Sequence, residues 1–401
     1  MHAPELPARP KTAPLWLLAL VTLSGTLGMH IFVPALPSAA TDLGASIGEM
    51  QLTVSLYILG LAVGQLVYGP LSDRFGRRPT LMFGLVLYTA SGLAAAFAPH
   101  VDSLIAARLF QALGGCAGMV LGRAIVRDTS APEASARRLA LLSLIVSVGP
   151  GAAPIIGSAL AATLGWRSIF YVLFVLGIVN FICSWRFLPE TGQAGSHTNA
   201  ATLLRNYGQL LRSRAFLGYA IGGGCSTTSG YAFIASAPFI FVNQLHRPAH
   251  EVGLYLAILI AGGSLGVGLA SRLVGRISIQ SLLIRANAAS VLGAFVFLGV
   301  VLSGHLSVVW TVIPLFIFMF GSGMGGPASI TLAIGVNTRV IGSASGLYGF
   351  TQMFIGAVCT ALVGLGHNPA LAAATILAVT GAMGQLSFWV AMRSRQGSDD
   401  A

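Results

Sequence analysis

Long apolar stretches follow one another along almost the whole chain, and they limit what it can fold into. Twelve runs of about 20 mostly apolar residues can be placed, the length that a helix needs to cross a bilayer. They cover residues 14–36, 49–69, 80–98, 103–126, 138–162, 166–188, 215–241, 252–271, 281–301, 308–332, 340–364 and 370–392. Lipid offers no hydrogen-bond partner to an open backbone, so each run is expected to be a helix. The sequence therefore predicts an all-α integral membrane protein with twelve spans.

The composition excludes a soluble protein. Charged residues make up 8% of the chain and hydrophobic residues 55%, whereas a soluble domain carries roughly 25% charged residues. The net charge of +11 comes from arginines that lie between the apolar runs, so it does not indicate nucleic-acid binding. The four cysteines lie inside apolar stretches without metal-ligand spacing, so we expect no disulfide framework, no metal and no cofactor.

Positive charges are distributed unequally between the two sides of the predicted membrane. Eighteen of the 22 lysine and arginine residues fall on the side that holds both chain ends, and only Arg167 and Arg247 fall on the other. The last two, Arg108 and Arg123, lie within span 4. The positive-inside rule then places both termini in the cytoplasm. The expected organisation is a cytoplasmic tail (1–13), six spans (14–188), a cytoplasmic loop (189–214), six more spans (215–392) and a second cytoplasmic tail (393–401).

A short charged turn between spans 2 and 3 carries the most specific motif. It reads Gly69-Pro70-Leu71-Ser72-Asp73-Arg74-Phe75-Gly76-Arg77-Arg78-Pro79. This order resembles the turn G-x-L-x-D-R-x-G-R-R of the major facilitator superfamily, whose members are alternating-access transporters. The resemblance implies two pseudo-symmetric six-helix bundles. A weak internal repeat agrees with it, since Gly69-x-x-Ser72-Asp73-x-x-Gly76-Arg77 is echoed after span 8 by Gly268-x-x-Ser271-Arg272-x-x-Gly275-Arg276.

The same resemblance implies a conformational latch on the cytoplasmic side. Its expected members are Gly69, Asp73, Arg74, Gly76, Arg77 and Arg78 of the turn, with Asp128 at the end of span 4. In the family, an aspartate like Asp128 pairs with an arginine of the turn, here Arg74 or Arg77. The aspartate of the turn faces the start of span 11, near Gly342, where free N–H groups and the helix dipole favour a carboxylate. The latch would hold the outward-facing state.

Span 4 contains an intramembrane arginine, Arg108, with Gln111 one turn further on. Insertion of such a charge into the membrane costs about 3 kcal/mol or more, so the side chain normally faces a cavity or a partner. The alternative is that the side chain of Arg108 extends to the outer membrane surface. The segment resembles the superfamily signature R-x-x-Q-G-x-G. That resemblance implies an arginine that faces the central cavity and takes part in proton coupling.

No aspartate or glutamate lies inside any predicted span. Proton-driven exporters of the resembling family usually carry a span-1 carboxylate just before the turn that reads Val33-Pro34-Ala35-Leu36-Pro37 here, and His30 stands in its place. Thr22, Thr26 and His30 recur at spacing four and form one polar stripe. Two interpretations stay open: a protonation switch, since histidine titrates at about 6.5, or a neutral ring that hydrogen-bonds substrate or a threonine.

Span 5 contains Gly149-Pro150-Gly151-Ala152-Ala153-Pro154-Ile155-Ile156-Gly157. The two prolines alone predict a bent helix, but the pattern also resembles the G-P-x-x-x-P-x-x-G motif of the antiporter, export-type branch. Smaller matches, such as Leu188-Pro189-Glu190-Thr191 and Ser236-Ala237-Pro238-Phe239, resemble the Bcr/CflA drug-resistance subfamily. These resemblances imply export rather than uptake and a bacterial inner membrane.

The sequence thus predicts a secondary active exporter of small amphipathic molecules that is driven by the proton gradient. Because a fixed intramembrane carboxylate is missing, neutral or weakly anionic substrates such as amphenicols are favoured. The candidate cavity residues are Tyr57, Met119, Tyr231, Phe233, Met324, Tyr348 and Gln352.

A facilitator or proton-coupled uptake transporter is the alternative. An enzyme has no motif in its favour, since HExxH is absent and Lys11, the single lysine, cannot complete a Walker A loop. The expected partners are substrate, protons and lipid, and a monomer suffices.

Overall fold

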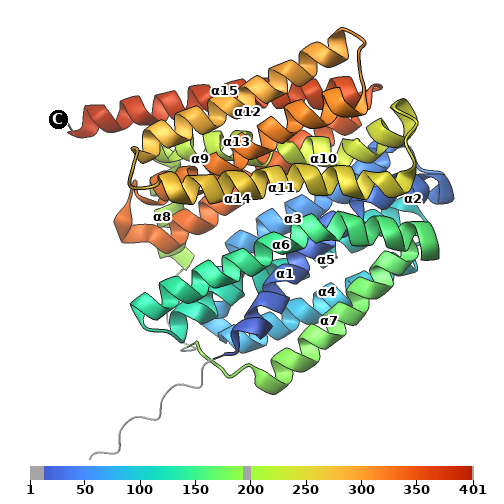
Figure 1. The fold of residues 1–401 in the computed structure, drawn as a ribbon. Coiled ribbons are helices and arrows are strands. Elements are labelled where there is room, and N and C mark those ends of the chain that lie inside the picture. The colour runs from blue at the N-terminus through green and yellow to red at the C-terminus, as the bar shows by residue number, and fades with distance from the viewer. Residues whose placement is uncertain (1–12, 193–199, 400–401) are drawn as a thin grey trace, which may run out of the picture.

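The computed structural model describes residues 13–192 and 200–399. Within these residues the chain is helical, with one isolated β-bridge between Val274 and Ile277. The helices form two layers, one from the first half of the chain and one from the second (Figure 1). The chain has the all-α architecture that its apolar runs predict.

Both layers consist of long helices joined by short turns. The first half contains α1 (Leu15–Ile31), a 3₁₀ turn (Val33–Ala35), α2 (Leu36–Leu43), α3 (Ile47–Phe75), α4 (Arg77–Ala96), α5 (Val101–Asp128), α6 (Pro132–Leu164) and α7 (Arg167–Phe187). The second half contains α9 (Arg214–Thr227), α10 (Gly230–Phe239), a π-helical turn (Ile240–Gln244), α11 (Ala249–Leu273), α12 (Ile279–Leu302), α13 (Val308–Ile334), a 3₁₀ turn (Thr338–Val340), α14 (Ile341–Gly364) and α15 (Pro369–Asp399). Between the halves lies α8 (Ala200–Arg212).

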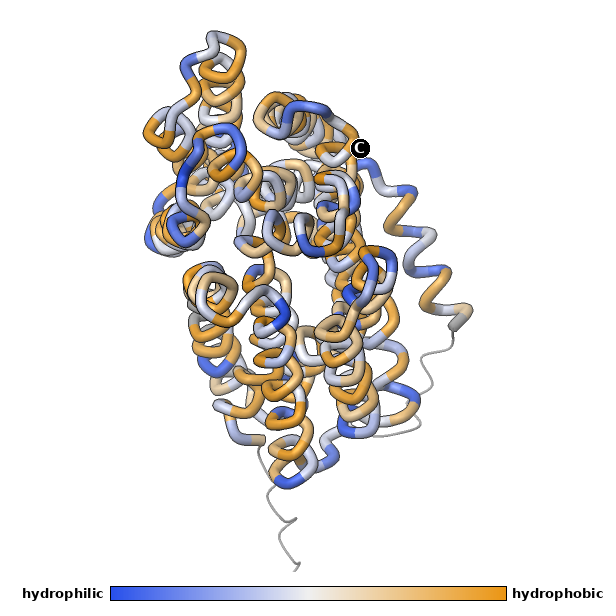
Figure 2. The backbone as a smooth tube through the Cα atoms, turned by 90° about the vertical axis from the view of Figure 1, so that its right-hand side faces the viewer, coloured by the Kyte–Doolittle hydropathy of each residue, from blue (hydrophilic) through white to orange (hydrophobic). Residues whose placement is uncertain are grey.

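The helices have the length and surface of membrane spans. Among the described residues, 11 helical segments are long and apolar enough to cross a bilayer. α6 completes the twelve; it has 33 residues, with the apolar stretch Gly149–Leu164 at its end. Large apolar side chains such as Phe83, Trp185 and Leu386 are exposed on the outside. Figure 2, a view along the helices, shows hydrophobic residues over the outer sides of both layers, where lipid replaces water as solvent.

Two predicted spans are interrupted helices. The first run ends as a regular α-helix at Ile31, passes through the 3₁₀ turn and continues as α2 to Leu43. Pro34 lies in that turn and cannot donate the backbone hydrogen bond that a continuous helix requires. The seventh run divides into α9 and α10. Both interruptions occur in helices that face the other half of the molecule, since α10 contacts the first 3₁₀ turn.

The predicted loop and tails differ from the observed chain in two places. The central segment 189–214 contains the helix α8, and α15 continues to Asp399, beyond the expected end of span 12 at residue 392. Residues 1–12, 193–199 and 400–401 lie outside the described residues, so nearly all of the first tail and part of the central loop do as well. α8 was missed because a short amphipathic helix in a polar stretch has no bilayer-length apolar run.

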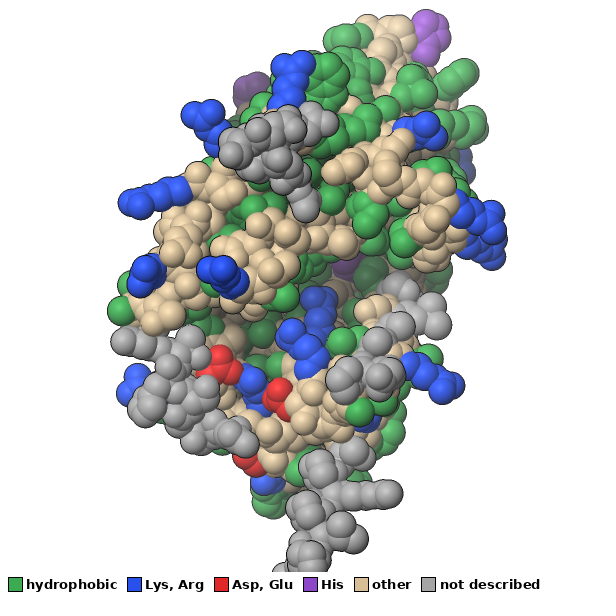
Figure 3. Space-filling view, turned by 90° about the vertical axis from the view of Figure 1, so that its left-hand side faces the viewer, with side chains coloured by type: hydrophobic (Ala, Val, Ile, Leu, Met, Phe, Trp, Pro, Cys, Tyr) green, Lys and Arg blue, Asp and Glu red, His purple; other side chains and the backbone are tan. Residues whose placement is uncertain are grey.

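The two halves are in contact at the end opposite the charged turn. α3 packs on α14, and α6 packs on α11. Gln51 Nε2 donates to Ser236 Oγ at 3.0 Å, and Ser158 Oγ donates to the carbonyl of Ala249 at 3.1 Å. At the other end a cavity of about 580 Å³ separates the halves. Figure 3 shows this end, with basic and acidic side chains around a hollow between the two layers.

The internal repeat corresponds to repeated local structure. Ser72 Oγ donates to the carbonyl of Gly69 at 2.8 Å, and Ser271 Oγ donates to the carbonyl of Gly268 at 2.7 Å. Gly76 and Gly275 follow with φ of 96° and 88°, a left-handed region that favours glycine. The echo in the sequence therefore marks two equivalent turns, after α3 and after α11.

Candidate functional site

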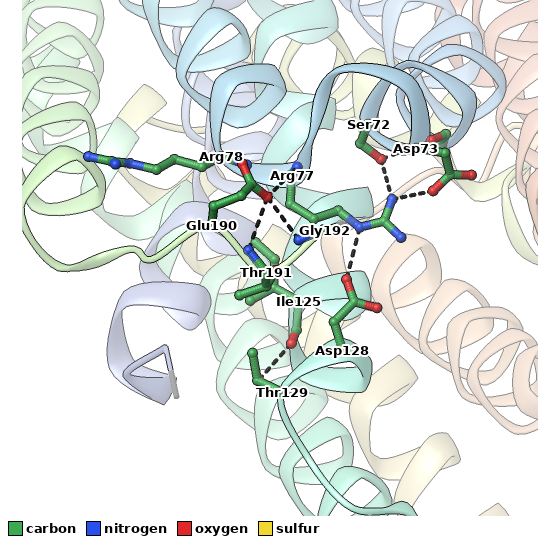
Figure 4. Close-up of polar contacts among 11 residues, drawn as sticks. Ser72, Asp73, Arg77, Arg78, Ile125, Asp128, Thr129, Glu190, Thr191 and Gly192 are labelled. Atoms are coloured by element: carbon green, nitrogen blue, oxygen red, sulfur yellow. Dashed lines mark hydrogen bonds and ion pairs between the residues drawn. The ribbon is translucent and has the colours of Figure 1, made fainter. Parts of the chain in front are cut away.

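Arg77 is the centre of the charged turn. Its Nη1 lies 2.5 Å from Asp73 Oδ1 and 2.5 Å from Ser72 Oγ. Its Nε donates to Asp128 Oδ2 at 2.9 Å (Figure 4). Of the two arginines expected to pair with Asp128, the structure therefore uses Arg77. Its planar guanidinium bridges both carboxylates, which a lysine ammonium could not do with the same geometry.

The other arginines of the turn have different neighbours. Arg74 lies over the ring of Phe75, 5.2 Å from its centroid. Arg78 Nη2 donates to the carbonyl of Trp185 at 2.7 Å, which ties the start of α4 to the end of α7. The three arginines are thus not interchangeable, because each contacts a different part of the first half.

Among the described residues, Asp73 has no hydrogen bond or ion pair to the second half. Asp73 and Gly342 both line the cavity, but the carboxylate of Asp73 pairs with Arg77, within its own half. The expected contact between Asp73 and the start of α14 therefore stays a prediction for a different state. At this end the cavity separates the two halves, while at the opposite end they are in contact.

Glu190 is a member of this cluster that the sequence reasoning did not assign. Its Oε1 accepts from the backbone N–H of Arg77 at 2.9 Å, and its Oε2 accepts from the N–H of Arg78 at 3.2 Å. Oε1 also accepts from the N–H of Gly192 at 2.8 Å (Figure 4). The carboxylate thus caps the first turn of α4, where free N–H groups and the helix dipole favour negative charge. The sequence could have indicated that this helix needs a cap from elsewhere, because Gly76, the residue before it, has no side chain to cap it.

Arg108 is fully buried inside the first half. One nitrogen, Nη1, donates to the carbonyl of Gly28 at 2.9 Å and to Gln111 Oε1 at 2.8 Å. The guanidinium lies 3.9 Å from the centroid of the Tyr57 ring, a cation–π arrangement. Extension to the membrane surface does not fit this buried position. Arg108 Nε and Nη2 and Gln111 Nε2 have no hydrogen-bond partner among the described residues.

His30 lies at the boundary between the halves. Its ring is edge-on to Tyr231 of α10, with centroids 6.1 Å apart. Its Nδ1 is 2.8 Å from the carbonyl of Thr26. A carbonyl can only accept, so Nδ1 carries a hydrogen and Nε2 is the nitrogen that can take up a further proton. The hydroxyl of Thr26 bonds to Leu23 at 3.0 Å instead of to the ring.

The proline-rich motif of span 5 lies where α6 passes between α1 and α11. A Cβ on Gly157 would lie 1.8 Å from the carbonyl oxygen of Ile31, and one on Gly149 would lie 2.0 Å from Leu23. Pro150 and Pro154 lie inside α6. The carbonyl of Pro154 packs against Gly253 of α11, 2.5 Å from the position of an added Cβ. The motif therefore brings α6 close to its own half and to the other half.

The cavity contains three of the seven predicted lining residues. Met119, Tyr348 and Gln352 line it. Tyr57 and Phe233 are fully buried: the Tyr57 hydroxyl donates to Gly25 at 2.8 Å, and Phe233 packs on Phe297 with ring centroids 5.7 Å apart. Tyr231 packs on His30 as described above. Met324 is partly buried in the second half. None of these four is among the residues that line the cavity in the described chain.

Other lining residues were not predicted. The polar and charged ones come from both halves and from α8: Gln65, Arg123, Arg127, Tyr207, Ser343 and Ser345. Burial raises the pKa of Tyr207, so its hydroxyl stays neutral and can donate a hydrogen bond. These residues could not be found from apolar periodicity, because their common surface forms only when the two halves meet.

Comparison with known proteins identifies the fold and its relatives. The model of the "Major Facilitator Superfamily" matches residues 18–361. A Bacillus subtilis protein described as "Uncharacterized MFS-type transporter YdgK" is 31% identical over 407 residues and covers 100% of both chains. "Multidrug transporter MdfA" of Yersinia pestis is 25% identical over 339 residues, which cover 84% of this chain and 83% of that protein.

Solved structures show the same fold at lower identity. A D-xylose–proton symporter has a TM-score of 0.76 with 16% identity and covers 94% of this chain and 96% of the other. A bacterial homologue of the lysosomal transporter Spinster, in an inward-facing, unoccupied conformation, has a TM-score of 0.73 with 15% identity and covers 95% and 97% of the two chains. Together with the family match, these structures confirm the predicted architecture. The chain therefore belongs to the major facilitator superfamily and is a membrane transporter, not an enzyme.

Proposed function

We propose that this transporter exports small amphipathic molecules in exchange for protons and belongs to the Bcr/CflA drug-resistance branch. The cavity between the halves carries this proposal. Apolar side chains such as Met119 and Met353 line it together with polar groups such as Gln352 and Tyr348. A site that combines apolar surface with polar anchors suits small amphipathic ligands.

The conformation fits a carrier that loads from the cytoplasm. We place both termini and the charged turn on the cytoplasmic side of a bacterial inner membrane, on the strength of the arginine distribution. The cavity then opens inward, while Gln51 and Ser236 hold the outer end closed. Closure of the inner end would bring Asp73 to the start of α14 and complete the latch. The working unit is a monomer of two bundles, 14–188 and 215–392.

His30 is the proposed proton carrier. It contacts Tyr231 of the second half, so a charge that forms on Nε2 changes the contact between the two halves. Burying an unpaired charge is costly, and protonation would therefore favour a state in which this contact is opened or solvated. The relation to a named multidrug transporter supports drug export. Neutral and weakly anionic molecules such as amphenicols are favoured, since no carboxylate is available beside His30.

The test is drug accumulation in cells that express the full chain, compared with cells that carry an empty vector. The compounds are chloramphenicol, nalidixic acid and ethidium, each with and without a protonophore. Export coupled to protons lowers accumulation of chloramphenicol, and the protonophore abolishes the difference. Lower accumulation that survives the protonophore would indicate a facilitator. Ethidium export without chloramphenicol export would contradict the proposed substrate class.

Two variants then separate the roles of His30. His30→Gln keeps a hydrogen-bond donor for the carbonyl of Thr26 but does not titrate, whereas His30→Asp restores a titratable carboxylate. If His30 carries the proton, the glutamine variant loses uphill export but still equilibrates drug across the membrane, and the aspartate variant regains uphill export. Uphill export that persists in His30→Gln would show that His30 is a binding or packing residue only.

A further inference from the structure

Span 4 contains a second arginine, Arg123, to which the proposed transport cycle gives no role. It lies in α5 and lines the cavity. Among the residues whose side chains the structure describes, no hydrogen bond or ion pair to Arg123 is found. It lies five residues before Asp128, the end of the helix, which places it about 7.5 Å further into the cavity at 1.5 Å per residue. An arginine at this depth is available to a ligand.

The charges around the cavity leave a positive surplus. The charged lining residues are three arginines and two aspartates: Arg77, Arg123, Arg127, Asp73 and Asp128. Both carboxylates bond to Arg77, so neither is committed to Arg123 or Arg127. The cavity thus offers cationic groups without a free anion, which attracts negatively charged ligands and repels cations.

α5 presents one apolar and two basic side chains in sequence along the cavity. Met119, Arg123 and Arg127 recur at spacing four, so they lie on one face of α5, and all three line the cavity. Across the cavity, α14 contributes Tyr348 and Met353. A ligand with an aromatic body could place that body between Met119 and α14 while its anionic group reaches Arg123. A guanidinium binds a carboxylate with two parallel hydrogen bonds.

We propose that Arg123 is the residue that selects amphipathic organic anions, in particular aryl carboxylates, at the inward-open site. This proposal rests on the proposed function in that it names the substrate class of the same cavity. Arg127, nearer the mouth, increases the local concentration of anions by long-range attraction. The two-donor geometry of the Arg123 guanidinium sets the binding orientation.

The test uses the purified full chain and two probes of nearly equal shape, 2-naphthoate and 2-naphthamide. Binding is measured by calorimetry, which requires neither proton coupling nor export. Wild-type protein should prefer the carboxylate by about tenfold or more, because the guanidinium makes two charge-assisted hydrogen bonds to a carboxylate that it cannot make to a neutral amide. Arg123→Gln should remove this preference and leave naphthamide affinity within about twofold. Arg123→Lys, which keeps the charge but loses the two-donor geometry, should show an intermediate preference.

Arg186→Gln is the matched control, because Arg186 is exposed at the end of α7 and does not line the cavity. It should behave like wild type. Equal losses for both probes in Arg123→Gln would indicate a structural role and overturn the proposal. An unchanged preference, or no preference in wild type, would overturn it as well. Wild-type protein that binds neither probe would also contradict it.

An anionic lipid headgroup shares the chemistry of a carboxylate, so the measurement is repeated in nanodiscs of phosphatidylcholine with and without phosphatidylglycerol. Naphthoate affinity that is equal in both supports a substrate site. Displacement of naphthoate by phosphatidylglycerol would show that lipid occupies Arg123 and would overturn the substrate assignment. Carboxylate selection by the purified protein with no export in cells would separate the two proposals: the site would stand and the export function would fail.

Discussion

At the scale of single residues, one guanidinium connects two acids of the first half. Arg77 contacts Asp73 and Asp128, and Glu190 caps the backbone from which Arg77 extends. The side chain of Arg77 is 18% exposed, so water screens these contacts only in part. In the proposed latch, Asp73 leaves Arg77 for the start of α14 as the halves move, while Arg77 keeps Asp128.

This arrangement predicts that Arg77→Lys slows export by about tenfold, since a charged hydrogen bond contributes about 1.5–3 kcal/mol and lysine cannot bridge both acids. The measurement is the initial efflux rate of a substrate found in the accumulation assay. The control is Arg186→Lys, since Arg186 is exposed and lies outside the cluster. This variant of the protein should export at the normal rate. An unchanged rate in Arg77→Lys would mean that charge alone, without the bridging geometry, is sufficient.

The residue scale is also where sequence reasoning was least complete. The order of the charged turn indicated the Asp128 pair, but it left Arg74 and Arg77 as equal candidates. Only the fold separates them, because α4 begins at Arg77 and directs its side chain between α3 and α5. Arg108 was expected to face the cavity, whereas it is enclosed by Tyr57 and its own half. A linear pattern specifies that a buried charge needs partners but does not say on which side of the helix they lie.

At the scale of elements, the contact between α1 and α6 depends on the absence of side chains. Gly157 leaves no room for a Cβ beside the carbonyl of Ile31. Pro150 and Pro154 interrupt the backbone bonds of α6, so the helix can adapt to its two neighbours. The motif that resembled an antiporter signature is thus a packing device in this conformation. The motif also contacts the other half, because the carbonyl of Pro154 packs against Gly253 of α11.

We expect Gly157→Ala to destabilise the protein by about 1–3 kcal/mol, the usual cost of overpacking, and to reduce export. Gly151→Ala is a matched control in the same helix, because nothing lies within 4 Å of its added Cβ. The measurement is the unfolding temperature of each purified variant together with its efflux rate. Equal behaviour of the two variants would contradict the close contact of α1 and α6.

The sequence predicted the membrane-spanning helices better than it predicted the contacts of single residues. Bilayer thickness imposes a length on each apolar run, so twelve spans could be placed without knowledge of their packing. The break between α9 and α10 was not predicted, and the turn at Pro34 was expected at the end of span 1, whereas the helix continues after it as α2. Both breaks lie where helices of opposite halves meet, and hydropathy does not report such contacts.

At the scale of the whole molecule, one end is closed and the other is open. Ser236 is fully buried beneath its contact with Gln51, while Ser343 lines the cavity. Among the described residues, the two bundles therefore enclose a cavity that lies at the end that carries the charged turn. A change of state requires that these two ends exchange roles.

Cysteine labelling with a membrane-impermeant maleimide tests this asymmetry. Ser343→Cys should react in inside-out vesicles, and Ser236→Cys should be protected from both sides in a resting membrane. Wild-type protein, whose four cysteines are unpaired and largely buried, gives the background. Labelling of Ser236→Cys in right-side-out vesicles would instead show that the resting carrier is open to the outside.

The repeated turns after α3 and α11 suggest how the two halves came to differ. Both keep the serine-to-glycine hydrogen bond and the left-handed glycine. Arg272 occupies the place of Asp73, however, so the second copy has no acid to exchange. The two halves thus share the geometry of this turn, whereas only the first has the acid of the proposed latch. Under the proposed latch, salt that screens the charge of Asp73 would act through the first half and move the second half only through the contacts between them.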